Sequence, residues 1–231
     1  MPRQTDAAHR PRAPLSRQRV LSAAVALADE GGADALSMRK IAQHLGVVPM
    51  ALYKHVAHKD ELLDGMIDAV VGEIDPLVED ADWKTTVRLR VLSARRMLLR
   101  HSWAPGVIEA RMKARAAPTP AVTAYLDQMI GVFRAGGFPL DLVHHAMHVM
   151  GSRLLGFSQE LFDDSPGRPP DADALPPEEA AARYPHIAAL ARAVTHDKGS
   201  VVGSGCDDQF EFEFALDLTL DGLERLRAAA G

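Results

Sequence analysis

The stretch that most constrains the fold of this chain is Ser37 to Lys59, SMRKIAQHLGVVPMALYKHVAHK. Its first part predicts a short helix, residues 38–45, because apolar residues recur there at helical spacing behind a serine cap. Gly46 permits the positive-φ turn that ends this helix. Pro49 suits the first turn of a second helix, which we expect to reach Val56. Two short helices joined by a tight turn form the helix-turn-helix arrangement, whose second helix enters a DNA major groove.

The outward face of the second helix favours contact with DNA. Leu52 and Val56 are expected inside, and the exposed face begins with small and apolar side chains instead of the mixed charges of a solvated helix. Hydrogen-bonding side chains gather at its far end, where phosphates would lie. An ordinary corner between two helices, with no nucleic acid partner, is the alternative that the pattern alone leaves open.

The distribution of charge supports a basic front end on an acidic body. The net charge is −5, yet residues 1–59 hold nine Lys and Arg against four Asp and Glu. Such a division localises the attraction for DNA and discourages the rest of the chain from touching it. Chance asymmetry is the alternative reading.

Apolar spacing predicts an all-α protein, and no segment has the alternation typical of a β-strand. We expect a flexible basic arm (1–14), a helix-turn-helix domain (15–60) and a larger helical domain for ligand binding and dimerisation (61–231). Ser16 and Asp82 are expected to cap helices. Besides the two short helices, the expected helices span residues 17–30, 59–74, 83–101, 107–112, 119–134, 139–161, 178–194 with an interruption near Pro185, and 207–229.

The last helix predicts a homodimer because it has two apolar stripes, and a helix that is apolar on two sides must be covered on two sides. One stripe (Phe212, Leu216, Leu220, Leu223 and Leu226) is assigned to the interior of its own subunit. The other is assigned, with the helix that begins at Pro139, to a seam with a second copy. A core helix of a monomer is the alternative. The predicted interface residues are Leu142, Met150, Phe210, Phe214 and Leu218.

Two longer segments give a resemblance to a known family. LSMRKIAQHLGVVPMALYKHVAHKDELLDGM, preceded by RQRVLSAAVALADEGGADA, resembles the N-terminal domain of the TetR family of bacterial transcriptional repressors. The body resembles that of the tetracycline repressors at Trp83, LLRH (98–101), GGF (136–138), the spacing of Gly151 and Gly156, and FEFALDLTLDGLERL. A bacterial cytoplasmic location is expected, since the chain lacks a membrane-length apolar run and Cys206 is its single cysteine.

The resemblance implies specific contacts with double-stranded operator DNA. Arg39 would read a base edge, most naturally a guanine, and Pro49, Met50 and Ala51 would touch thymine methyl groups. Arginines of the N-terminal arm would add contacts with the minor groove or the backbone. The residues expected to hold phosphates are Ser37, Tyr53, Lys54, His55 and Lys59.

The resemblance also implies a small-molecule effector that forces the two heads out of register with DNA. Ile108 stands where the family's tetracycline repressors have a metal-ligating histidine, Ser152 replaces a second pocket histidine, and Arg90 replaces a drug-binding asparagine. We therefore expect a flatter or more apolar effector than magnesium–tetracycline, such as an antibiotic or polyketide-like compound whose exporter the protein controls.

Periodicity and the resemblance together suggest which residues line the effector pocket, although ordinary core packing is an equal alternative for most of them. Methionines suit a pocket that adapts its shape. The expected lining is Ile67, Val71, Arg90, Ala94, Met97, Ile108, Met112, Met129, Phe133, His148 and Ser152.

No cofactor, metal or catalytic residue is expected. His144 and His148 have the spacing of a metal pair, but no Glu or Cys supports them in sequence, so a hydrogen-bonded role in the pocket or seam is preferred. No nucleophile elbow, phosphate loop or dinucleotide fingerprint is present, which argues against an enzyme. An activator, an effector-independent DNA-binding protein and a helical small-molecule carrier or enzyme remain as alternatives.

Overall fold

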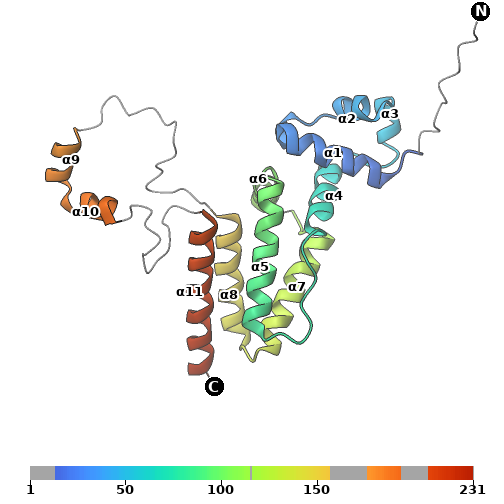
Figure 1. The fold of residues 1–231 in the computed structure, drawn as a ribbon. Helices are drawn as coiled ribbons and strands as arrows, with labels where there is room; N and C mark the ends of the chain where they lie inside the picture. The colour runs from blue at the N-terminus through green and yellow to red at the C-terminus, as the bar shows by residue number, and fades with distance from the viewer. Residues whose placement is uncertain (1–13, 115, 157–175, 194–207, 231) are drawn as a thin grey trace, which may run out of the picture. The chain divides into compact units, whose positions relative to one another are not determined.

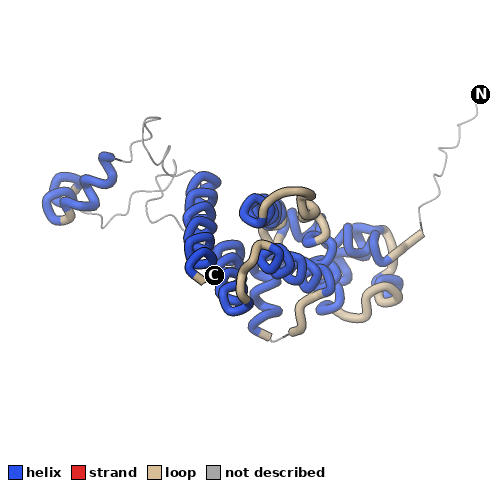
Figure 2. Tube along the Cα trace, turned by 90° about the horizontal axis from the view of Figure 1, so that it is seen from below, coloured by secondary structure: helices blue, strands red, loops and turns tan. Residues whose placement is uncertain are grey.

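The computed structural model describes residues 14–114, 116–156, 176–193 and 208–230. These residues form helices and loops and no strand, which confirms the all-α prediction (Figures 1 and 2). The expected basic arm and Cys206 lie outside the described residues, apart from Pro14. The helices are α1 (Arg17–Gly31), η1 (Ala33–Ala35, a 3-10 turn), α2 (Met38–Leu45), α3 (Pro49–Leu52), α4 (Lys59–Val71), α5 (Trp83–Arg100), α6 (Ala104–Lys113), α7 (Pro120–Ala135), α8 (Leu140–Leu155), α9 (Pro177–Arg183), α10 (Pro185–Ala193) and α11 (Asp208–Ala229).

The chain divides into two units, which are described separately. The first contains the residues up to 78 and 93–131, and the second contains 79–92 and the residues from 132 onward. Helices α1 to α4 and α6 therefore belong to the first unit, and α8 to α11 to the second. No described helix is both long enough and apolar enough to cross a membrane.

Helices α1 to α4 form the part of the first unit that we call the head. Local capping explains why the head folds as the sequence predicts. The Ser16 hydroxyl accepts from the backbone N–H of Arg19 at 3.2 Å, and the Ser37 hydroxyl accepts from that of Lys40 at the same distance. These contacts satisfy amides that the first turn of each helix leaves open. Gly46 has φ 66° and ψ 39°, the left-handed conformation expected of the turn between α2 and α3.

The apolar residues of α1 to α4 form one core. Helix α1 packs against α2 and α4, and α2 packs against α3 (Figure 1). The largest buried side chains of this core are at most 1% exposed, so polar substitutions there would unfold the head. They are Val20, Ile41, Leu52, Val56, Leu62, Met66 and Val70.

The second helix of the helix-turn-helix is shorter than predicted. Helix α3 ends at Leu52, and Tyr53 to His55 form a turn. The backbone amides of His55 and Val56 both donate to the Leu52 carbonyl, at 2.8 and 3.0 Å, so the last turn tightens and does not extend. The two residues predicted to face inward are nevertheless buried, since Leu52 and Val56 are 0% and 1% exposed.

Three other helix boundaries differ from the prediction. Helix α4 ends at Val71, and Gly72 donates back to the Asp68 carbonyl at 3.0 Å. Helix α6 begins at Ala104, earlier than expected, because Pro105 lies in the first turn, where its missing N–H is not needed. Helix α8 ends at Leu155 and is followed by Gly156, while residues 157–161 lie outside the described part. The expected break near Pro185 is confirmed by the separation of α9 from α10.

In the second unit, charged side chains join α5 to α11. Arg88 contacts Asp217 at 2.7 Å and Glu213 at 2.7 Å, and Lys84 pairs with Asp221 and with Glu224. The hydrogen bond with Asp221 raises the pKa of Lys84, and it lowers the pKa of the Asp221 carboxyl. Together with the packing of α8 on α11, this ladder holds α11 to the rest of the second unit.

An aromatic cluster packs at the C-terminal end of α7. Trp83, Phe133 and Phe138 pack edge-on or tilted, with ring centroids 4.6 to 5.9 Å apart. Gly136 makes this approach possible, since a Cβ added there would lie 2.7 Å from Trp83 Cβ and 2.8 Å from its Cγ. Neither atom can move without displacing the ring.

Gly136→Ala is therefore expected to destabilise the fold by about 1–3 kcal/mol through overpacking. Gly131→Ala is the matched control, because a Cβ at this position of α7 would meet nothing within 4 Å. In a helix that substitution is expected to be neutral or to stabilise by up to about 1 kcal/mol. Urea unfolding of both variants measures the difference, and equal stabilities would contradict the close approach.

Candidate DNA-binding and effector-binding sites

The residues predicted to contact DNA lie together on the surface of α2, α3 and the start of α4. Met50 is 72% exposed and Tyr53 is 45% exposed, although both belong to the segment whose interior side chains are fully buried. Ala51 and His55 are half-buried. The remaining members, all exposed, are Ser37, Arg39, Pro49, Lys54 and Lys59.

The basic members of this surface keep their charges available. Among the residues that the structure describes, no ion pair engages Arg39, Lys54 or Lys59. Ser37 differs, because its hydroxyl oxygen already accepts from the amide of Lys40. A DNA phosphate would therefore accept a hydrogen bond from the serine hydroxyl while the cap stays in place.

A histidine that the sequence reading missed caps α4. It lies directly after the recognition segment, our name for residues 48–56, which contain α3 and the turn that follows it. The backbone N–H of Glu61 donates to His58 Nδ1 at 3.1 Å, and the N–H of Ala57 donates to Glu61 Oε2 at 2.7 Å. The Ala57 hydrogen bond lowers the pKa of the Glu61 carboxyl. The spacing of His58 and Glu61 is that of a capping box, so the signal was present although the residue type is unusual.

His58→Ala should destabilise the head by about 1 kcal/mol, because the first turn of α4 loses a cap. His58→Asp should recover that loss, since a carboxylate both accepts from the Glu61 amide and favours the helix N-terminus. Denaturant unfolding with an unchanged m-value is the measurement. If His58→Asp were as unstable as His58→Ala, the side chain would not be acting as a cap.

Two aspartates on α4 connect this helix to α6 and α7 within the first unit. Asp64 Oδ2 accepts from Arg111 Nη2 of α6 at 2.6 Å, and Arg111 Nη1 also lies 3.5 Å from Asp60. Asp68 Oδ1 accepts from the backbone N–H of Ala121 at 2.9 Å, which caps the start of α7. Helix α4 thus leads from the head to two helices that follow it in the chain.

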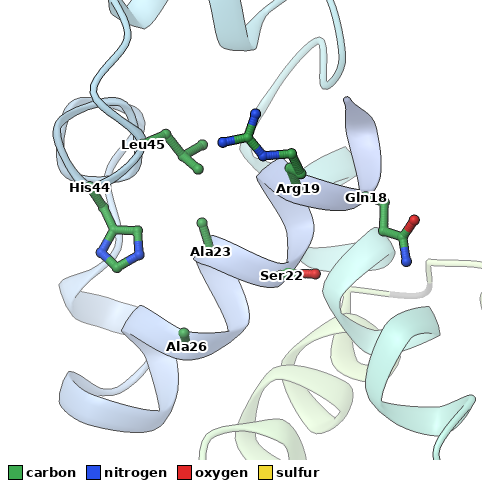
Figure 3. Close-up of a pocket in the computed structure, with 7 residues that line it drawn as sticks. All are labelled: Gln18, Arg19, Ser22, Ala23, Ala26, His44 and Leu45. Carbon is green, nitrogen blue, oxygen red and sulfur yellow. The ribbon is translucent and has the colours of Figure 1, made fainter. Parts of the chain in front are cut away.

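A groove on the head lies between α1 and α2. Its lining consists of Gln18, Arg19, Ser22, Ala23, Ala26, His44 and Leu45. Figure 3 shows Arg19 and Ala23 of α1 facing Leu45 of α2. Several of the lining residues are exposed, so this is a shallow surface groove and not an enclosed effector cavity. It shares no residue with the predicted effector lining.

The predicted effector-lining residues of the first unit are mostly interior. Ile67, Val71, Ala94, Met97 and Met129 are between 1% and 9% exposed. Ile108 is half-buried. Met112, by contrast, is 64% exposed, because it lies near the end of α6 and points away from the core.

In the second unit, too, some of the predicted lining residues are buried and others are exposed. Arg90 and Phe133 are 8% and 0% exposed, and Phe133 belongs to the aromatic cluster with Trp83. His148 and Ser152 lie on the exposed face of α8, opposite the buried stripe of that helix. The structure therefore gives no enclosure to these two residues or to Met112.

The predicted dimer residues have different degrees of exposure. Phe214 and Leu218 of α11 are 42% and 55% exposed, and Phe210 and Leu142 are half-buried. Met150 is 3% exposed within its own subunit, so a seam on the outer face of α8 would exclude it. The interior stripe of α11 is buried as expected through Leu223, but Leu226 is 57% exposed and does not belong to it.

Three histidines lie on α8. The rings of His144 and His148 are 4.6 Å apart, and those of His144 and His145 are 5.5 Å apart, each in an edge-to-face arrangement. Within the described ranges, no group of three or more His, Cys, Asp or Glu side chains is arranged to hold a metal ion.

A capped helix-turn-helix with an exposed, basic outer face, followed by a larger helical body, defines a DNA-binding transcriptional regulator. Comparison with known proteins gives the family. Residues 20–66 match the profile of bacterial regulatory proteins of the tetR family, and residues 75–227 match that of the tetracyclin repressor-like C-terminal domain. The chain belongs to the TetR family of transcriptional regulators, which are not enzymes.

Individual relatives agree with this assignment. An HTH-type transcriptional regulator of Saccharopolyspora erythraea is 35% identical over 54% of this chain and 51% of its own length, so the match spans about half of that relative. The class G tetracycline repressor of Vibrio anguillarum is 31% identical over 93% of this chain and 96% of its own. The crystal structure of ActR from Streptomyces coelicolor, without ligand, has a TM-score of 0.69 at 26% identity, covering 95% of this chain and 99% of ActR.

Proposed function

We propose that this protein is a dimeric repressor that binds operator DNA through α2 and α3 and releases it when a small-molecule effector binds the helical body. The observation that carries the DNA-binding part is the exposed face of the recognition segment. Val48 and Met50 are 68% and 72% exposed beside side chains with no exposure at all. Large apolar side chains at such exposed positions are typical of a contact surface.

The DNA contacts follow from the chemistry of each side chain on this surface. Arg39 reads a base edge through its guanidinium, and Pro49, Met50 and Ala51 contact thymine methyl groups. The phosphates are held by hydroxyl, imidazole and ammonium groups, which fix the position of the head without reading sequence. These groups belong to Ser37, Tyr53, Lys54, His55 and Lys59.

A homodimer supplies two such heads. Phe210 and Phe214 stack with ring centroids 6.2 Å apart, and Leu218 continues the same exposed stripe of α11. The opposite side of α11 carries the buried residues Phe212, Leu216, Leu220 and Leu223, so this stripe is directed outward. We assign it, with Leu142 of α8, to a two-fold seam, since isologous interfaces are self-complementary.

The effector is proposed to be an antibiotic or a polyketide-like compound. ActR is known in complex with actinorhodin, and that structure is 25% identical to this chain with a TM-score of 0.66. Ile108, Arg90 and Ser152 replace the polar residues expected of a magnesium–tetracycline site, which favours a flatter or more apolar molecule. Control of an exporter for that compound is the physiological role that we propose.

Helix α4 is the proposed route from effector to DNA. It packs on α1 of the head and carries Asp64, whose ion pair with Arg111 joins it to α6. A displacement of α6 would therefore act on the orientation of the head through a charged contact that is partly buried.

A binding titration on the DNA upstream of the protein's own gene tests the proposal. Salt-dependent binding that candidate antibiotics or polyketides weaken is the expected result. Binding that no compound alters would indicate an effector-independent DNA-binding protein. Absence of salt-dependent duplex binding would contradict the proposal and favour a small-molecule carrier.

A further inference from the structure

A buried histidine joins the DNA-binding head to the corner between α5 and α6. His101 is 3% exposed and follows the last residue of α5. Its Nδ1 lies 2.8 Å from Asp29 Oδ1, in the last turn of α1, and its Nε2 lies 3.2 Å from Glu73 Oε2, just after α4. Three segments of the first unit therefore meet at one imidazole ring.

The surrounding groups fix which atoms donate. Trp103 Nε1 donates to Asp29 Oδ1 at 2.7 Å, and Arg100 pairs with Glu73 Oε2. The charged groups that face the ring are thus Asp29 from α1, Glu73 from the segment after α4 and Arg100 from α5. The start of α6 contributes only the neutral indole of Trp103.

The hydrogen bonds of this cluster require a particular protonation state. An ionised carboxylate only accepts hydrogen bonds, and a neutral imidazole carries a proton on one ring nitrogen alone. His101 can donate to both Asp29 and Glu73 only when both ring nitrogens carry protons. Loss of one proton to solvent places a nitrogen lone pair against a carboxylate oxygen, which breaks one of the two contacts.

We infer that His101 is a positioning residue whose imidazolium latches α1 of the head to the α5–α6 corner, so that DNA affinity depends on its protonation. The latched head is held in one orientation before it meets DNA. With the latch open, binding must also immobilise the head, which weakens affinity. This inference rests on the proposed function, since it concerns the same DNA-binding head.

The direction of the pH dependence follows. The latch contributes stability and DNA affinity at low pH, where both ring nitrogens are protonated, and the contribution is lost as pH rises. If His101 had only a structural role, its replacement would weaken DNA binding by the same factor at every pH. The head contains other histidines, His44, His55 and His58, so the wild type must be compared with variants at each pH.

Two variants are expected to have opposite effects on the latch: Glu73→Gln should keep it closed, and His101→Gln should open it. In Glu73→Gln the amide can donate to His101 Nε2 while Nδ1–H still donates to Asp29, so the latch stays closed with a singly protonated ring. In His101→Gln one amide cannot donate to both carboxylates at the separation that the ring spans. Glu73→Gln is also mild for folding, because the ion pair that it removes with Arg100 is exposed and the contact with His101 Nε2 is kept as a hydrogen bond.

The experiment measures affinity for an operator duplex between pH 6 and pH 8.5 at constant salt. The wild type should bind as tightly as Glu73→Gln at pH 6 and about 5- to 10-fold more weakly at pH 8.5, the range of a modest coupling. His101→Gln should be weaker than Glu73→Gln by a constant factor throughout. A ratio of wild type to His101→Gln that does not change with pH, or that rises with pH, would overturn the latch.

Thermal unfolding over the same pH range separates this inference from the proposed function. The melting temperature of the wild type relative to Glu73→Gln should fall as pH rises, whether or not any DNA binds. If duplex binding is absent in all variants but this shift is present, the latch stands and the proposed DNA function fails. If DNA binds but neither readout depends on His101 protonation, the proposed function stands and the latch fails.

Discussion

Replacing Phe214 and Leu218 together with glutamate is expected to give a monomer at micromolar concentration. Both side chains are about half exposed within one subunit, at 42% and 55%, so the helical fold should be kept. In the dimer the same change would bury four carboxylates in an apolar seam, which is strongly unfavourable. Losing the second head should lower operator affinity by about 10²- to 10⁴-fold, because two linked heads bind with avidity.

Leu99→Glu is the matched control for this double variant. Leu99 of α5 is also an exposed leucine, at 57%, but it belongs neither to the proposed seam nor to the DNA-contacting surface. Its variant should remain dimeric in sedimentation velocity and bind operator normally. A Phe214→Glu/Leu218→Glu protein that stays dimeric would show that the seam lies elsewhere.

Arg39→Ala is expected to lose about 1–3 kcal/mol of operator affinity and to relax sequence preference at one base-pair position. The reason is that a guanidinium reads a guanine edge with two hydrogen bonds, and alanine makes neither. Binding to a set of duplexes, each changed at one position, measures the effect. Unchanged preference at every position would contradict the assignment of Arg39 to a base.

Lys59→Ala and Lys40→Ala complete this comparison. Lys59→Ala should weaken all duplexes alike and reduce the slope of log affinity against log salt by about 1, as expected for one lost phosphate contact. Lys40 is an exposed cation of α2 outside the proposed contacts. Its replacement should leave both sequence preference and salt slope close to those of the wild type.

The head could be predicted from sequence because its signals are local. Ser16, Ser37 and Gly46 each act on amides or carbonyls within a few residues, and the structure confirms all three. Pro49 starts α3 as expected. The length of α3 could not be predicted, since the tight turn after Leu52 leaves no trace in the apolar spacing.

The contacts that join distant segments could not be predicted from one sequence. Asp64 and Arg111 are 47 positions apart, and Asp29 and His101 are 72 apart, with no periodic pattern to relate them. In the sequence, His101 stands out only as part of the LLRH segment. Its partners became known once the fold brought the ends of α1, α4 and α5 together.

The effector site was the hardest to predict, because a pocket residue and a core residue have the same apolar signature. Phe133 illustrates this, since its spacing fits a pocket wall, but its ring packs with Trp83 and Phe138. Met112 and His148 show the opposite difficulty. Helical spacing placed them inward, but the described structure leaves both exposed.

Selection of duplexes from random sequence by the purified protein tests the central claim most directly, because it presumes no operator. A two-fold dimer that presents two recognition segments predicts enrichment of an inverted repeat whose half-site centres lie about 34–36 Å apart, one turn of DNA. Enrichment of a single unrepeated half-site, or of no sequence at all, would contradict the account.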